Sequence, residues 1–107
     1  MKSIIFLFTT LVLFGCKKSE QPQSATSCDP QISYKNTVKA IFVNNCTASG
    51  CHDGVDLASL SDYLVARDAS GQIRTAVKNG VMPKNGSLSI ANKDAIICWI
   101  DNGSKNN

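Results

Sequence analysis

The chain of 107 residues contains a single histidine and two methionines, and its longest apolar run is too short to span a bilayer comfortably. One histidine makes a tetrahedral zinc site a poor fit, because such sites usually take four ligands from two separated pairs. It also leaves no second imidazole for a catalytic base, and we expect no enzymatic activity. Lysine and arginine outnumber aspartate and glutamate by 11 to 8, yet no basic run with interleaved aromatics indicates nucleic-acid binding.

The N-terminal residues have the pattern of a processing signal. The apolar run at residues 4–14 suits the central region of a secretory signal. It ends at Gly15-Cys16, which resembles the lipobox of bacterial lipoproteins, where cleavage precedes a cysteine that carries diacylglycerol. Residues 1–15 are therefore predicted to be a lipoprotein signal peptide, and residues 16–27 a lipidated cysteine with a flexible polar tether. An ordinary signal peptide with an incidental cysteine is the alternative.

Lipidation of Cys16 would hold the mature chain on a membrane, facing the periplasm or the cell surface. Lys17 stands where an aspartate often retains lipoproteins in the inner membrane. This slightly favours the outer membrane.

Residues 46–52, CTASGCH, have the residue types that covalent haem attachment requires. Each thiol can add across one vinyl group of the porphyrin, and the imidazole beside the second thioether then lies under the iron. Four residues separate the thiols instead of the commoner two, and Gly50 accepts the backbone angles of a bulged loop. We predict one haem c, with Cys46 and Cys51 as thioether anchors and His52 as proximal iron ligand. A Cys46–Cys51 disulfide is the alternative.

Helical spacing of apolar residues predicts an all-α domain at residues 28–107. Ser33 is a candidate cap for the first helix, and Ile73 and Val77 are expected to face inward in the third. The predicted helices lie at residues 33–45, around the four residues Leu57, Leu60, Tyr63 and Leu64 with Ser59 or Ser61 as cap, at 70–79 and at about 91–102. A domain of about 80 residues has a marginal side-chain core, and a porphyrin would add an apolar centre.

Two cysteines, Cys28 and Cys98, remain after those for lipid and haem. In an exported protein an even remainder predicts a disulfide. Two buried free thiols are the alternative.

The order of helix, haem loop, two short helices, methionine loop and a terminal helix with Trp99 resembles the small monohaem class I cytochrome c domain, as found in exported proteins of Bacteroidetes-type bacteria. The matching segments are 38–42, 45–46, 50–54, 81–83 and 99–103. The resemblance implies a class I fold around one haem, with Met82 as distal iron ligand. Pro83 biases Met82 towards an extended backbone. A methionine that only fills the core is the alternative.

Ligation by His52 and Met82 implies a membrane-tethered carrier of single electrons between redox protein partners of the cell envelope, because it leaves no open iron position. Three lysines near the methionine loop, Lys78, Lys84 and Lys93, could attract an acidic partner, and scattered solvated lysines are the alternative. Two other functions stay open. One is a haem-based ligand sensor, from which Met82 dissociates, and the other is a haem-free structural lipoprotein stabilised by disulfides.

Overall fold

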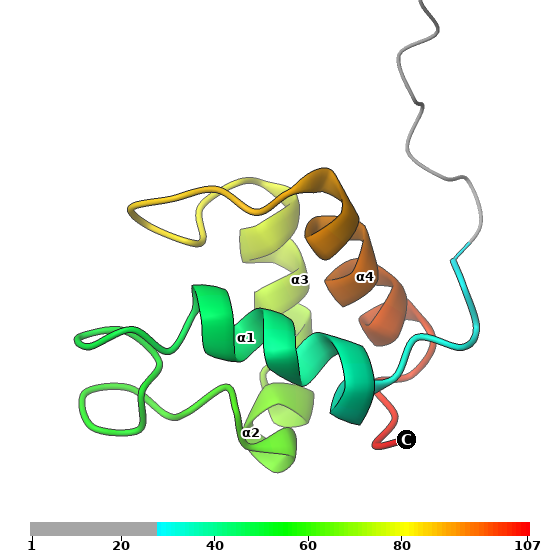
Figure 1. The fold of residues 1–107 in the computed structure, drawn as a ribbon, viewed down its shortest axis with the longest axis horizontal. Coiled ribbons are helices and arrows are strands. Elements are labelled where there is room, and N and C mark those ends of the chain that lie inside the picture. The colour runs from blue at the N-terminus through cyan, green and yellow to red at the C-terminus, as the bar shows by residue number, and fades with distance from the viewer. Residues whose placement is uncertain (1–27) are drawn as a thin grey trace, which may run out of the picture.

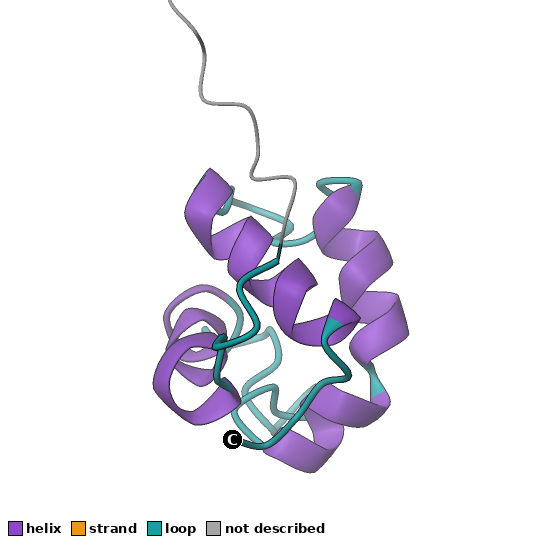
Figure 2. Cartoon of the chain, turned by 90° about the vertical axis from the view of Figure 1, so that its right-hand side faces the viewer, coloured by secondary structure: helices purple, strands orange, loops and turns teal. Residues whose placement is uncertain are grey.

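The computed structural model describes residues 28–107, which are helical without any strand in that range. A π-helical turn, η1 (Tyr34–Val38), leads into α1 (Lys39–Asn45), and α2 (Tyr63–Asp68), α3 (Ser70–Lys78) and α4 (Ile90–Asp101) follow (Figure 1). One residue separates α2 from α3, and loops join α1 to α2 and α3 to α4 (Figure 2). The predicted all-α class is confirmed.

The predicted signal peptide at residues 1–15, the predicted lipidation site Cys16 and the predicted tether at residues 16–27 lie outside the described residues. Of the helices between residues 28 and 107, none has the length and apolar character needed to cross a membrane.

The first helix begins where the sequence predicts, at a Ser33 cap. The Ser33 hydroxyl accepts a hydrogen bond from the Asn36 amide at 3.2 Å. The Ser33 carbonyl accepts from both Thr37 and Val38, at 3.0 and 3.1 Å, and this double acceptance widens the first turn into a π-helical one. The turn buries Val38, and α1 then buries Phe42 on the same side.

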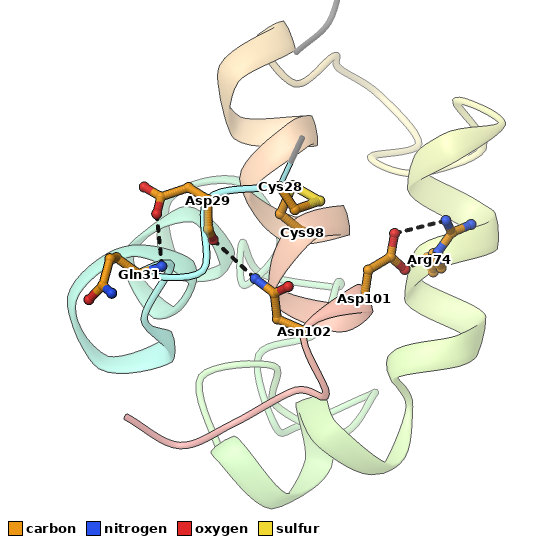
Figure 3. Close-up of a disulfide and its surroundings, with 7 residues drawn as sticks. All are labelled: Cys28, Asp29, Gln31, Arg74, Cys98, Asp101 and Asn102. Atoms are coloured by element: carbon orange, nitrogen blue, oxygen red, sulfur yellow. Dashed lines mark hydrogen bonds and ion pairs between the residues drawn. A yellow bond between two sulfur atoms is a disulfide. The ribbon is translucent and has the colours of Figure 1, made fainter. Parts of the chain in front are cut away.

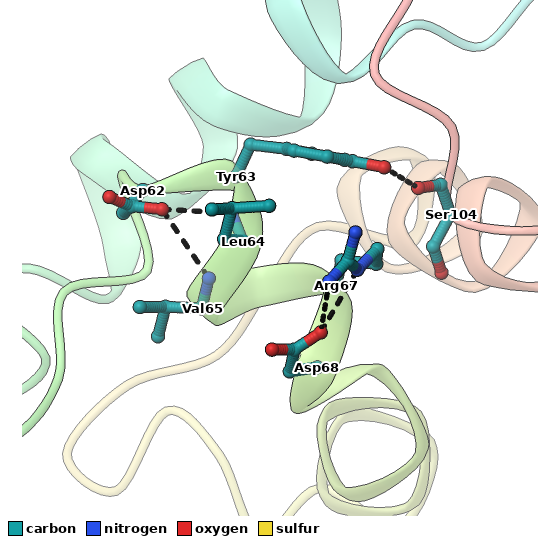
Figure 4. A network of polar contacts seen from close by, with 7 residues as sticks. All are labelled: Asp62, Tyr63, Leu64, Val65, Arg67, Asp68 and Ser104. Atoms are coloured by element: carbon teal, nitrogen blue, oxygen red, sulfur yellow. Dashed lines mark hydrogen bonds and ion pairs between the residues drawn. The ribbon is translucent and has the colours of Figure 1, made fainter.

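The predicted second helix is wrong in its start and its cap. It begins at Tyr63, and the cap is Asp62, whose Oδ1 accepts from the amides of Leu64 at 2.8 Å and Val65 at 3.4 Å (Figure 4). One carboxylate therefore satisfies two of the donors that a helix leaves free at its first turn. Leu60 packs in the core from the turn before the helix.

Within residues 28–107, ten buried apolar residues form the core, and Trp99 of α4 lies at its centre. The Trp99 indole is fully buried, with its ring centroid 5.4 Å from that of Tyr34 and 6.3 Å from that of Phe42. Ile73 and Val77 of α3 face this core, as predicted. The core residues are Tyr34, Val38, Ile41, Phe42, Leu60, Ala66, Ile73, Val77, Ile96 and Trp99.

The residues after α4 form hydrogen bonds with side chains of the core, of α2 and of the first helix cap. The Trp99 indole N–H donates to the Lys105 carbonyl at 2.9 Å, and the Tyr63 hydroxyl donates to the Ser104 carbonyl at 3.0 Å (Figure 4). The Ser33 hydroxyl donates to the Asn107 carbonyl. The C-terminal segment thus joins the start of the first helix to α2 and α4.

A disulfide joins Cys28 to Cys98, with 5.1 Å between the two Cα atoms, and confirms the predicted pair (Figure 3). Beside it, the Asn102 side chain donates to the Asp29 carbonyl at 3.0 Å. The segment that precedes the first helix is therefore fixed to α4 by a covalent bond and a hydrogen bond.

Candidate ligand pocket

A pocket of about 490 Å³ opens between α1, α3 and the two loops that follow them. Its walls are mainly apolar and come from α1, α2, α3 and the loop before α2. The larger aliphatic and aromatic side chains that form them are Phe42, Leu57, Leu60, Val65, Ile73 and Val77. Phe42, Ile73 and Val77 also belong to the core, so the floor of the pocket is one side of the core.

The structure brings all four predicted haem-contacting residues to this pocket, since Cys46, Cys51, His52 and Met82 all line it. The first three come from the loop after α1, and Met82 comes from the loop after α3. Residues that are 30 or more positions apart in sequence thus share one cavity, as the prediction required.

The loop that carries Cys46 and Cys51 is folded back on the end of α1. The Cys46 amide donates to the Phe42 carbonyl at 2.7 Å and so continues the helix by one bond. The Cys46 carbonyl accepts from the His52 amide at 2.9 Å, and the Ala48 carbonyl accepts from the Cys51 amide at the same distance. These two bonds turn the chain back, so that the backbone of His52 lies next to that of Cys46.

The two thiols of this loop are both free, with Cys46 half-buried and Cys51 exposed. Burial raises the pKa of the Cys46 thiol, and the neighbouring Cys51 raises it further. Cys46 is therefore the less reactive thiol and Cys51 the more accessible one. The alternative Cys46–Cys51 disulfide is not formed in this structure.

The Asp53 carboxylate organises the same loop, and sequence reasoning missed it as a site residue. It accepts from the Val55 amide at 2.9 Å, the Gly50 amide at 3.3 Å and the Asp56 amide at 3.4 Å. The bond from Val55 is the main reason why the pKa of Asp53 is lowered. The Asp-Gly pair at residues 53–54 was the available signal, because it marks a turn.

The loop after α3, which carries Met82, is hydrogen-bonded to the last turn of α3. The Ala76 carbonyl accepts from the amides of Val81 at 2.9 Å and Met82 at 3.3 Å. Met82 is half-buried and lies outside the core, on the pocket wall, next to Pro83 and Lys84.

Of the three lysines predicted around this loop, Lys84 lines the pocket. The Lys93 ammonium donates to the Lys78 carbonyl at 3.1 Å, which brings those two residues together.

The prediction of a membrane-tethered electron carrier is corrected by this structure. Within residues 28–107, no three histidine, cysteine, aspartate or glutamate side chains gather in a group that could hold a metal ion. The covalent link that the structure does contain is the Cys28–Cys98 disulfide. Both findings favour the disulfide-stabilised alternative over the electron carrier.

Searches with protein-family models, among curated proteins and among solved structures gave no match to this chain.

Proposed function

We propose that the chain is a disulfide-stabilised lipoprotein domain, whose fold is held together by its own side-chain core. This domain binds a flat apolar ligand in the pocket. The observation that carries this proposal is the position of the pocket. The core and the Cys28–Cys98 bond secure α4 against the first helix, while the cavity opens on the side of α1 and α3 that both loops line.

The size and lining of the pocket define the class of ligand. Its volume of about 490 Å³ lies within the range of small-molecule and cofactor sites. Apolar walls from α1 and α3 suit a ligand with two broad apolar faces. The polar groups, Lys84 among them, are few, which suits a ligand whose polar edge faces the solvent.

A pair of neighbouring substitutions in α3 tests this proposal. Ala76 lines the pocket, whereas Thr75, the residue before it, is exposed and does not line it. Ala76→Phe is expected to fill part of the cavity and to weaken binding of metal-free protoporphyrin at least about tenfold, which corresponds to about 1.4 kcal/mol. Thr75→Phe is the matched control and should bind as the wild type does. Equal binding by both variants would show that the ligand sits elsewhere.

A specific observation favours haem c as a second candidate for the occupant. The pocket wall carries two thiols, one imidazole and one thioether, which are the groups that attach and ligate a haem. Cys46 and Cys51 would hold the porphyrin, and His52 and Met82 would face its iron. On this candidate, the domain has a fold of the class I cytochrome c type and serves as a haem-based ligand sensor. The iron of a bound haem would supply a binding position for a small molecule once Met82 is released.

Expression with a haem-maturation system separates the two candidates. The alkaline pyridine haemochrome spectrum and the intact mass report whether one haem per chain is attached covalently. Attachment that is lost in Cys46→Ala and Cys51→Ala supports the second candidate, and carbon monoxide binding to the reduced protein near neutral pH supports the sensor. Protein that never gains haem mass but still binds the porphyrin supports the first candidate.

We also propose that Cys16 carries the lipid that holds this domain in the cell envelope, with the outer membrane favoured. The support is the apolar run that ends at Gly15-Cys16. Cys16→Ser is expected to leave precursor behind or to release the domain from the membrane fraction. Cys16→Ser protein that is still cleaved and still partitions into detergent would contradict the proposal.

A further inference from the structure

The loop at residues 46–57 consists of two halves that contribute different parts of the pocket. The first half carries Cys51 and His52, and the second half ends in Leu57, all of which line the cavity. The second half is closed on itself by the bond from the Gly54 amide to the Leu57 carbonyl, at 2.9 Å.

The Asp53 carboxylate lies between these halves and bonds to both. Its Oδ2 accepts from Gly50 in the first half, at 3.3 Å, and its Oδ1 accepts from Val55 and Asp56 in the second, at 2.9 and 3.4 Å. Within the described part of the chain, no other side chain of this loop bonds to both halves. Thr47, for comparison, bonds back to the Val43 carbonyl of α1.

We infer that Asp53 is a positioning residue for the pocket, which sets the distance between the Cys51-His52 edge and the Leu57 wall. This inference rests on the proposed binding function and assigns to it a residue that does not itself line the cavity. Without the carboxylate, the two halves of the loop become fixed relative to each other only when the ligand binds. The entropy lost in that step reduces the affinity.

The same loop supplies a matched control for charge. Asp56 is an exposed aspartate three residues after the half-buried Asp53, but the amides of Gly50 and Val55 bond to Asp53 and not to Asp56. Asp53→Ala removes both a charge and the hydrogen bonds, whereas Asp56→Ala removes only a charge. Asp53→Asn keeps an oxygen that can accept from Val55 and removes the charge.

The binding test uses the oxidised protein with its disulfide intact and metal-free protoporphyrin as the probe, followed by quenching of the single tryptophan, Trp99. Asp53→Ala is expected to raise the Kd about tenfold, the effect of one or two hydrogen bonds. Asp53→Asn should recover most of that loss, and Asp56→Ala should bind like the wild type. The inference is overturned if Asp53→Ala binds normally, if Asp53→Asn binds no better than Asp53→Ala, or if Asp56→Ala weakens binding equally.

A second readout needs no ligand and therefore distinguishes failure of this inference from failure of the proposed function. Hydrogen exchange at the Gly50 and Val55 amides should become about tenfold faster in Asp53→Ala, and Cys51 should alkylate faster, with no change in Asp56→Ala. The melting temperature should fall only by the few degrees that the loss of one or two hydrogen bonds allows, because the buried core is unchanged. Unchanged exchange at both amides refutes the positioning role even if the wild type never binds the porphyrin.

Discussion

Removal of the disulfide by the paired substitution Cys28→Ala and Cys98→Ala should lower the free energy of unfolding by about 4 kcal/mol. The bond joins residues 70 positions apart, and the chain-entropy relation for a loop of that length gives about 4.4 kcal/mol at 25 °C. A domain of this size has a total stability of only about 4–12 kcal/mol. The variant should therefore lie close to the limit of folding.

Urea unfolding followed by circular dichroism at 25 °C measures this loss. For an m-value of about 1–2 kcal/mol per molar urea, the midpoint should fall by roughly 2 M or more. Cys51→Ala is the matched control, because it removes an exposed free thiol and leaves the bond in place. A loss below about 1 kcal/mol in the paired variant would refute the argument that the bond acts by constraining the unfolded chain.

Three further predictions concern the core, the C-terminal segment and pH. Ile96→Val should cost about 0.5–1.5 kcal/mol in urea unfolding, because Ile96 is fully buried. Tyr63→Phe should cost about 1 kcal/mol in the same assay, since it removes the hydrogen bond to the Ser104 carbonyl. Hydrogen bonds from Arg74 lower the pKa of Asp101 (Figure 3), so this pair stabilises the fold above the unfolded pKa of about 3.9. The stabilisation is lost as the pH falls through the lower folded pKa of Asp101. In Arg74→Gln, the melting temperature should therefore depend less on pH across that range.

Local sequence signals located most of the helices, and the number of cysteines predicted the Cys28–Cys98 bond, while the hydrogen bonds over long sequence separations were not predictable. Ser33 and the spacing of Ile73 and Val77 gave correct features because capping and periodicity act within a few residues. The second helix was misplaced because Leu60 fits a helical spacing but packs from a turn, and Asp62 decides the start of the helix.

The closure of the fold by the C-terminal segment had no local signal. The Tyr34 amide donates to the Asn107 side chain across 73 positions, at 3.3 Å, and the intervening sequence contains no pattern that indicates it. Only the tertiary arrangement of the first helix and α4 brings these ends together.

The candidate site was predictable as a set of residues but not as a function. Cys46, Cys51, His52 and Met82 were all expected around one ligand, and they all line one pocket. The role of Asp53 escaped prediction, because its three hydrogen bonds depend on how the loop folds. The step from these residues to electron transfer went further than the structure supports.

The most direct test of the pocket as a binding site is a titration of the oxidised wild-type domain with metal-free protoporphyrin, followed by Trp99 fluorescence and by alkylation of the free thiols. We expect quenching that saturates at one porphyrin per chain, together with protection of Cys46, which lies on the pocket wall. Quenching that does not saturate, or saturation that leaves Cys46 as reactive as in the free protein, would contradict binding in this pocket.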